Sequence, residues 1–375
     1  MPSGALLIFV CSVAFAQASD PERLFHDAVA AQQQGNDALA IKDYRELLKL
    51  RPDVPEVQAN LGAALAHAGL YDEAIEQYRA ALTKRPGNSG LRLNLALAWY
   101  KKGDLPNAAA ELSSLHQAEP GNARVATLLG DCYSRMGRNK DAIAVLTPVE
   151  AANPDDVTVA GLLGAALIHD GRPREGLPKV EKAAEAGHNA EAYLLAAQTW
   201  LGLNEFERAH AATDAALKLN PHLPGLYTLS GRVKNYLGDY PGAKADLGQA
   251  LAANADDFDA HLTLGAILNA ERDLNGARLH VERALQIEPS AMLARYELGR
   301  IERSQGHIEA AVREFEKVVQ ADPNWLRPHI ELAALYYRLN RPEDGRKERA
   351  IVEKLSSQEG HDSDRLSPGA GNIRP

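Results

Sequence analysis

Residues 57–86, with the sequence VQANLGAALAHAGLYDEAIEQYRAALTKRP, hold the pattern that decides the fold of this chain. Leu61, Gly62 and Leu65 stand at i, i+1 and i+4, so they share one face of a first amphipathic helix. Gly69 follows the last apolar turn, where a helix commonly ends with a left-handed residue. These residues predict a short helix that is followed by a tight turn.

A second helix follows the turn and has its own start and stop signals. Asp72 stands in its first turn, where the positive end of the helix dipole favours an acid. Ala74, Tyr78 and Ala81 recur at i, i+4 and i+7 and form its inner side. Pro86 ends the helix, because the residue before a proline disfavours the helical conformation. The two helices form one hairpin, which is too small to bury its own apolar face.

The hairpin pattern recurs with a period of 34 residues, since 86 − 52, 120 − 86 and 154 − 120 between closing prolines each give 34. Later prolines at 221, 289 and 323 keep the register, apart from one residue lost in the fifth repeat. The turn column contains Gly35, Gly69, Gly103, Gly137, Gly171, Asn204, Gly238 and Gly306. The pairs of a leucine and a small residue are Leu61-Gly62, Leu95-Ala96, Leu129-Gly130, Leu163-Gly164, Leu264-Gly265, Leu298-Gly299 and Leu332-Ala333.

With these columns the sequence resembles the tetratricopeptide repeat family, whose pattern shares the period, the Leu-Gly pair, a facing alanine and the closing proline. The resemblance covers residues 21–355 and implies an all-α, right-handed superhelical solenoid of about ten helix-turn-helix hairpins. Small residues let the two helices of a hairpin approach closely, and we expect the large Leu, Tyr and Phe residues to fill the space between hairpins. Asn88, Asn122 and Asp156 follow closing prolines and are expected to cap the next helix.

The chain begins with a segment that differs from the repeats. Ala5 to Ala16 is uncharged and apolar, and residues 16–18 form a small-x-small pattern that is typical of a cleavage site. We therefore expect a signal peptide over residues 1–18 and an exported protein, periplasmic or secreted. No Lys or Arg precedes Ala5, as signal peptides usually require. A short anchor or tail on a cytoplasmic protein, or an incomplete start, is the alternative.

The repeats then divide into regular and irregular parts. We expect four regular hairpins over 19–154, an irregular fifth one over 155–189 and five more over 190–355. The last of these ends in a mostly charged helix, EDGRKERAIVEKL, which a terminal repeat needs as a polar cap. Residues 356–375 are polar and rich in Gly, Ser and Pro, so we predict a disordered tail.

The irregular fifth hairpin has Gly176 in place of the facing alanine and Pro178 inside its second helix, and Pro148 interrupts the helix before it. Proline removes a helix hydrogen bond and bends the axis, so we predict a kink or a loosened seam between residues 145 and 190. A local irregularity that packing absorbs is the alternative. In the seventh hairpin Lys234 occupies a core column and Tyr236 is displaced by two residues, which leaves open which of them turns inward.

The composition and the absence of catalytic motifs argue against an enzyme. The 375 residues carry a formal net charge of −9, whereas a general nucleic-acid binder has a basic excess. There is no GxxxxGKS/T, GxGxxG, HExxH, GxSxG or CxxC motif, and the 12 histidines lack metal-ligand spacing. Cys132 is best explained as a buried apolar side chain rather than a nucleophile. We expect no catalytic residue, cofactor or metal.

Binding is the function that the resemblance implies, because first helices of such hairpins line a concave groove that holds a peptide or a partner helix. Asn60 and Asn94 resemble the amides that hold a peptide backbone in the family, since an amide both donates and accepts. Only these two match the family's clamp for chaperone tails, so we do not expect that ligand. The candidate groove residues are Asn60, Asn94, His67, Lys101, Arg124, Asp131, Arg135, His169, Arg232 and Arg300.

The basic groups among these residues favour an acidic protein or peptide partner. The alternative is that cations in the last turn of each first helix, such as Lys101, only compensate the helix dipole. We predict a non-catalytic interaction scaffold of the cell envelope, with no nucleic-acid partner and no membrane span after signal cleavage. A regulatory or substrate-recruiting subunit of an enzyme or of an envelope assembly complex is the alternative function.

Overall fold

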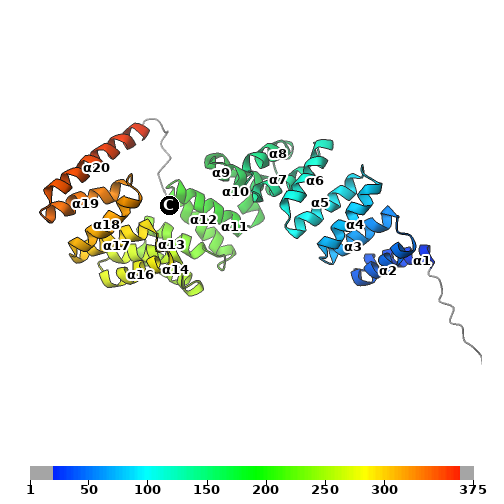
Figure 1. Ribbon diagram of the computed structural model, residues 1–375, viewed down its shortest axis with the longest axis horizontal. Helices are drawn as coiled ribbons and strands as arrows, with labels where there is room; N and C mark the ends of the chain where they lie inside the picture. The colour runs from blue at the N-terminus through cyan, green and yellow to red at the C-terminus, as the bar shows by residue number, and fades with distance from the viewer. Residues whose placement is uncertain (1–19, 364–375) are drawn as a thin grey trace, which may run out of the picture. The chain divides into compact units, whose positions relative to one another are not determined.

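The computed structural model describes residues 20–363, and over this range the chain forms 20 α-helices and no strand (Figure 1). Each odd-numbered helix packs against the even-numbered helix that follows it, which gives ten hairpins. This arrangement confirms the all-α solenoid of helical hairpins that the sequence predicts. None of the helices in the described range is both long and apolar enough to cross a bilayer.

Contacts between Cα atoms divide the chain into two compact units, Met1–Asn153 and Pro154–Pro375. We call them unit 1 and unit 2. Unit 1 contains α1 (Pro21–Gln33), α2 (Asp37–Leu50), α3 (Pro55–His67), α4 (Tyr71–Lys84), α5 (Ser89–Lys102), α6 (Leu105–Ala118), α7 (Ala123–Arg135) and α8 (Asn139–Ala152). The first 19 residues lie outside the described range, so the signal peptide stays a prediction.

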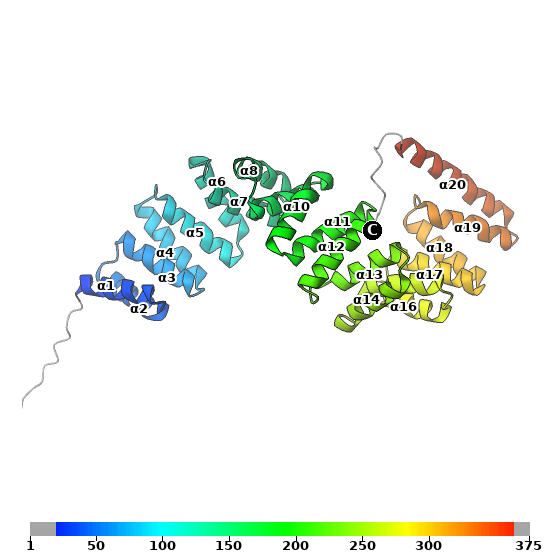
Figure 2. The ribbon, with the colours of Figure 1, turned by 180° about the vertical axis from the view of Figure 1, so that it is seen from behind.

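Unit 2 contains six hairpins, whose order along the chain is also visible from behind in Figure 2. Its helices are α9 (Val157–His169), α10 (Pro173–Gly187), α11 (Ala190–Gly202), α12 (Phe206–Leu219), α13 (Leu226–Tyr236), α14 (Tyr240–Ala253), α15 (Phe258–Ala270), α16 (Leu274–Ile287), α17 (Met292–Gln305), α18 (Ile308–Ala321), α19 (Leu326–Arg338) and α20 (Pro342–Ser363).

The turn inside every hairpin contains one residue with a positive φ. The predicted turn column accounts for eight of these residues, for example Gly69 with φ of 78° and Asn204 with φ of 60°. The other two are Arg272, with φ of 70°, and Asn340, with φ of 58°. Arginine is a poor residue for this conformation, because its Cβ atom crowds the following carbonyl oxygen. The turn geometry is thus retained where the sequence lacks the glycine that favours it.

The small residue of the Leu-Gly pair allows a large side chain of the same hairpin to pack directly on the first helix. A Cβ atom at Gly62 would lie 2.8 Å from Cε1 of Tyr78. Gly299 and Phe315 form the same contact in the ninth hairpin. Phe315 also shares a buried cluster with Leu332 and Leu335 of the next hairpin, as the sequence predicts. The large residues therefore fill space within their own hairpin as well as between hairpins. The physical reason for the contact within the hairpin is that the missing Cβ atom leaves a hollow that only the facing helix can fill.

The fifth hairpin is more closely packed than the sequence predicts. Helix α10 is continuous through Pro178, and α8 is continuous through Pro148, so neither proline interrupts its helix. Both prolines are exposed, and water can therefore satisfy the carbonyl groups that lose a partner. Gly176 lies against Gly164, so the two helix backbones touch. The predicted seam stays a prediction, and the unit boundary at residues 153 and 154 falls within its range.

Polar side chains secure the start of the first helices. The Asn88 side chain accepts a hydrogen bond from the Leu91 backbone N–H at 3.0 Å, as predicted, and Asn122 and Asp156 cap their helices in the same way. A further set of hydrogen bonds, made by Arg92, was not predicted from the sequence. Arg92 donates to the Pro86 carbonyl oxygen at 3.3 Å and to Glu111 at 2.8 Å. It therefore joins the end of one hairpin to both helices of the next.

The last hairpin closes unit 2 with a largely exposed helix. Arg349 of α20 lies 5.3 Å from the ring centre of Tyr337, and most side chains of α20 up to Ser357 face solvent. Helix α20 extends to Ser363, so the predicted tail does not begin at Ser356. Residues 364–375 lie outside the described range.

The glycine contact of the fifth hairpin leads to a first prediction. Substituting Gly176→Ala should lower the free energy of unfolding of unit 2 by about 1–3 kcal/mol, because the new methyl group overlaps the Gly164 carbonyl oxygen and must push two backbones apart. Gly248→Ala is the control, because nothing lies within 4 Å of a Cβ atom there on exposed α14. It should raise stability by about 0.5–1 kcal/mol. Urea denaturation of the full chain measures both, and equal effects would contradict the close packing.

Candidate interaction surface

In both units, several pairs of successive first helices contact one another. Helix α3 contacts α1 and α5, and α13 contacts α11 and α15, whereas no two successive second helices make contacts of this extent. The first helices therefore lie on the inside of the curve within each unit. We call the side of the first helices that faces away from their own second helices the inner face. This is the surface where the sequence analysis places its candidate residues.

The two candidate asparagines differ in what they contact. Asn60 is half-buried beside the hydroxyl group of Tyr44, which itself donates to Gln32 at 2.9 Å. Burial raises the pKa of Tyr44, and the hydrogen bond with Asn60 opposes this rise. Asn94 is exposed and makes no side-chain hydrogen bond within the described residues. Asn60 is therefore part of the internal packing, and only Asn94 has a free amide to offer.

The last-turn cations also separate into engaged and free groups. His67 Nδ1 lies 2.5 Å from Oδ2 of Asp37, which belongs to the preceding hairpin. Lys101 is exposed and forms no ion pair within residues 20–357. His169 in unit 2 is likewise exposed without a polar partner in the described part of the chain. All three residues lie in the last turn of their helix, as predicted. This position alone does not determine whether the side chain is already paired with an acid.

A small cluster connects the first helices of the third and fourth hairpins. The Tyr100 hydroxyl donates to Oδ2 of Asp131 at 2.5 Å, and this bond raises the pKa of Tyr100. Arg135 lies 3.9 Å from Asp131 and 5.2 Å from the ring centre of Tyr100. Asp131 is thus neutralised by its neighbours. Arg124 is exposed on the same helix and has no ion pair within residues 20–357, so the net charge offered by this part of the inner face is positive.

Within the described residues, the two candidate arginines in unit 2 are both paired, unlike His169. Arg232 lies 3.3 Å from Asp259, and Arg300 lies 2.9 Å from Glu297.

The seventh hairpin shows which of Lys234 and Tyr236 turns inward. Lys234 turns inward to Asp246 at 2.6 Å, whereas Tyr236 is exposed and its ring stacks on Phe206. An internal carboxylate therefore replaces the apolar contact that the core column usually provides.

The remaining groups of chemical interest are possible metal ligands and Cys132. No group of three or more metal-ligating side chains occurs in the described range. Cys132 is fully buried, and burial raises its pKa to about 11, with Asp131 adding to the rise. A thiol with this pKa is protonated at neutral pH and is a poor nucleophile. The structure agrees with the interpretation of Cys132 as a core residue.

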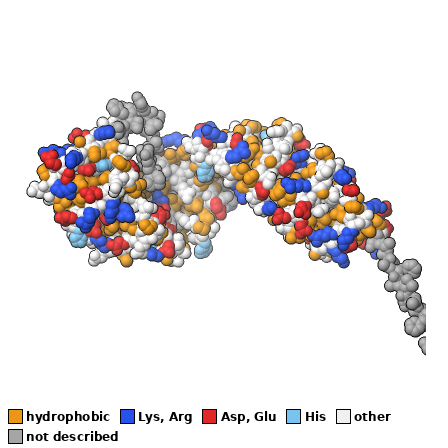
Figure 3. Space-filling view, viewed as in Figure 1, with side chains coloured by type: hydrophobic (Ala, Val, Ile, Leu, Met, Phe, Trp, Pro, Cys, Tyr) orange, Lys and Arg blue, Asp and Glu red, His pale blue; other side chains and the backbone are white. Residues whose placement is uncertain are grey.

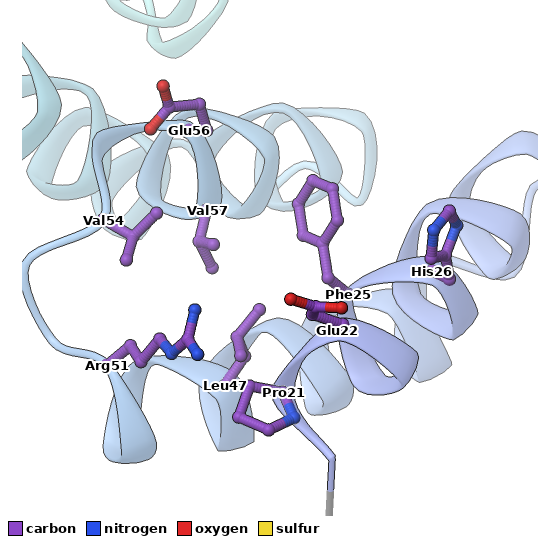
Figure 4. Close-up of a pocket in the computed structure, with 9 residues that line it drawn as sticks. All are labelled: Pro21, Glu22, Phe25, His26, Leu47, Arg51, Val54, Glu56 and Val57. Atoms are coloured by element: carbon purple, nitrogen blue, oxygen red, sulfur yellow. The ribbon is translucent and has the colours of Figure 1, made fainter.

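A hollow of about 340 Å³ lies at the start of unit 1, between α1, α2 and α3 (Figure 4). Phe25, Leu47, Val54 and Val57 point toward this space. Glu56 points away from it and pairs with Arg85 of the same hairpin. The sequence analysis did not predict this hollow, because it depends on how three helix ends splay apart.

The surface as a whole mixes charges of both signs. Basic and acidic side chains alternate over the face shown in Figure 3. Many of them pair across the boundary between consecutive hairpins, as Lys102 does with Asp72 at 2.5 Å and Lys244 with Glu271 at 2.7 Å. Exposed pairs of this kind stabilise a protein by only about 0–1 kcal/mol each. Their main effect here is to remove charges from the set that a partner could contact.

Two histidines form an unusual pair in the eighth hairpin. His261 Nε2 lies 3.0 Å from the Ala255 carbonyl oxygen, which can only accept, so Nε2 carries the proton. His261 Nδ1 lies 2.9 Å from Nδ1 of His280, which must then donate. Burial and the neighbouring His261 lower the pKa of His280, and Asp273 opposes this effect. The corresponding pair in the tenth hairpin is His329 with Glu348, at 2.5 Å.

Comparison with known proteins identifies the repeats. One family model described as tetratricopeptide repeat matches residues 65–115 and 100–166. A second model with the same description matches residues 28–89, 229–291 and 272–325. Together they cover more than half of the chain, in both units. No curated protein matches the sequence.

Solved structures share the architecture at low sequence identity. The crystal structure of the APC/C hetero-tetramer Cut9-Hcn1 matches with a TM-score of 0.52 and 14% identity, over 91% of this chain and 88% of that chain. A tetratricopeptide repeat protein from Parabacteroides merdae matches with a TM-score of 0.49 and 16% identity, over 66% of this chain and 98% of that chain. Yeast Tom70 matches with a TM-score of 0.38 and 15% identity, over 92% and 97%. The first of these shows the fold that the chains share.

The histidine pair leads to a prediction about pH. Because the pKa of His280 is lower in the folded chain, unit 2 should lose stability as the pH falls below the unfolded value of about 6.5. His280→Glu should reduce this loss, since it creates the histidine–glutamate pair that His329 and Glu348 form. The urea midpoint at pH 7.5 and pH 5.5 measures the change. His222→Glu, on an exposed loop, is the control, and an equal loss in all three proteins would contradict the assignment.

Proposed function

Because the chain belongs to the tetratricopeptide repeat family, whose fold is a scaffold for protein–protein interaction, we propose that it binds an extended segment of a partner protein on the inner face of unit 1. The scaffold is non-catalytic in this proposal. Its inner face presents side chains from several hairpins at fixed spacing, so one partner segment can contact consecutive hairpins. The position of the free polar groups supports this choice of surface.

The observation that carries the proposal is the combination of apolar and free polar groups on α5 and α7. Leu93, Leu97 and Tyr100 are spaced at i, i+4 and i+7 and are half-buried on the inner face of α5. Lys101 on α5 and Arg124 on α7 are exposed and have no ion pair in the described range. Apolar side chains can bind alternate residues of an extended segment, while the cations favour acidic ones. Leu93 and Tyr100 also pack against the core of unit 1, so part of each side chain is held in place while its half-buried surface stays accessible.

The free amide of Asn94 adds a group suited to a peptide backbone. Its side chain can donate to a backbone carbonyl and accept from a backbone N–H at the same time. It is exposed, whereas the equivalent Asn60 is engaged with Tyr44. We therefore place the centre of the binding surface on the third and fourth hairpins. A partner with acidic residues on either side of an apolar one would match the groups present.

Photo-crosslinking in cells tests this surface. A photoreactive residue at Asn94 or at Lys101 should capture one set of proteins or protein segments, because both positions are exposed on the inner face. The control is Glu76 on α4, which is also exposed but lies on a second helix. If the proteins captured at Glu76 are the same as those captured at Asn94, the inner face is not the binding surface.

We also propose that the protein acts in the cell envelope, and the apolar segment at residues 5–16 supports this location. Cell fractionation with mass spectrometry of the N-terminus should find an exported chain that begins at Ser19. Deletion of residues 2–18 should leave the protein in the cytoplasm. A full-length chain that still begins at Met1 in the cytoplasmic fraction would refute the proposed export.

A further inference from the structure

The inner face of α17 and α19 contains a cluster of three arginines and two glutamates. We call this group the arginine cluster; its members are Glu297, Arg300, Arg303, Arg327 and Glu331. Arg300 is bound to Glu297 on the same helix, and Arg303 crosses from α17 to Glu331 on α19. Arg327 and Glu331 also act electrostatically on Glu297. The two helices flank α18, as Figures 1 and 2 show, and the cluster joins their inner sides.

The acids of the cluster lie below its cations. The side chains of Glu297 and Glu331 are 10% and 15% exposed. Those of Arg300 and Arg303 are 35% and 38% exposed, and Arg327 is exposed as well. A molecule that approaches from solvent therefore meets guanidinium groups rather than carboxylates. The three arginines and two glutamates give a local charge of 3 − 2, that is +1, within a chain whose net charge is −9.

The arginines keep most of their hydrogen-bond donors free. Arg300 uses a single nitrogen, Nη1, for both oxygens of Glu297, at 2.9 Å each. Arg303 likewise uses only Nη1 for Glu331. Arg327 makes no hydrogen bond to any residue in the described range. The Nε and Nη2 edges of the planar groups are thus available for the paired hydrogen bonds that arginine forms with oxyanions.

The surrounding packing holds the cluster in place. The ring of Tyr296, next to Glu297, packs 5.1 Å from the ring of Trp325, which directly precedes α19. Trp325 supplies no side-chain cap to α19, so the first turn of that helix keeps its partial positive charge near Arg327. A cation at such a position is unfavourable for the helix itself. Its presence there is explained if an anion binds to it.

We propose that the arginine cluster binds the phosphate group of a phosphorylated side chain in a partner protein. A phosphate monoester carries close to two negative charges and three acceptor oxygens at neutral pH, which matches three arginines with free donor edges better than a single carboxylate does. Leu293 and Ile330 are 45% and 48% exposed on the same two helices and can contact apolar residues beside the phosphorylated one. The site lies in unit 2 and does not depend on the surface proposed for unit 1.

Fluorescence anisotropy with the full-length chain tests this site. The probe is a labelled peptide, Gly-Leu-phosphoserine-Ile-Gly, and its serine and glutamate counterparts are measured beside it. The phosphopeptide should bind at least about tenfold more tightly than either counterpart, because the paired charge-assisted hydrogen bonds need the dianion. Binding should also weaken as the salt concentration rises.

Arg327→Gln is the decisive variant, because Arg327 is exposed and its loss leaves no hydrogen-bond partner unpaired. It should weaken phosphopeptide binding about tenfold, a change typical of a lost charge-assisted bond. Arg313→Gln on α18 is the matched control, since Arg313 is also exposed and has no ion pair in the described range. Circular dichroism should show that both variants keep the helical content of the parent.

Three results would overturn the proposal. Equal binding by the Arg327→Gln and Arg313→Gln variants would show that the cluster is not the site. Equal binding of the glutamate peptide would assign the site to carboxylates instead of phosphate. Inorganic phosphate that binds as tightly as the phosphopeptide would exclude a protein segment as the ligand. Crosslinking at Asn94 is unaffected by any of these results, so failure of this proposal and failure of the unit 1 surface can be told apart.

Discussion

The contact on which this structure depends is the packing of the second helix of a hairpin onto a small residue of its first helix. It occurs where the first helix has a glycine or alanine, as at Gly62 beneath Tyr78 and at Gly265 beneath Val281. A large side chain fills the hollow, and the hairpin gains a dense interior although it has only two helices. Its outer apolar face still needs the next hairpin, so stability is shared between neighbours along each unit. A surface that spans several hairpins is a direct consequence.

Contacts between hairpins determine which charges remain for a partner. His67, Asp131 and Arg232 all lie on first helices, yet each is bound to a residue of an adjacent hairpin. Their partners are Asp37, Tyr100 and Asp259. Lys101 and Arg124 have no such neighbour in the described residues. The binding chemistry of the inner face is therefore what the internal ion pairs leave unpaired, and a count of basic residues by column overestimates it.

This distinction also explains what the sequence could predict. The period, the turns and the helix caps follow from local preferences, so Gly69 and Asn88 were assigned correctly from the sequence alone. The inward turn of Lys234 could not be predicted, because it depends on Asp246 in the facing helix. The effect of Pro178 on its helix could not be decided from the sequence for a similar reason, since the cost of a proline depends on whether the freed carbonyl group faces solvent. Residue spacing predicts where helices and turns form. Which side chains remain without a hydrogen-bond or ion-pair partner depends on neighbours that come together only in the folded chain.

The arginine cluster shows how a repeat protein can acquire a site that its repeat pattern does not encode. Glu297 and Glu331 occupy the column that contains Asn60 and Asn94 in unit 1, since all four precede a Leu of the Leu-small pair. In the third hairpin the column offers the free amide of Asn94, whereas in the ninth and tenth hairpins it has the carboxylates of Glu297 and Glu331, which hold Arg300 and Arg303. The residue in this column can therefore contact a ligand directly, or it can orient a neighbouring residue that contacts the ligand. The fold fixes where side chains stand, and the choice between an amide and an acid at one column changes the ligand that the surface can bind.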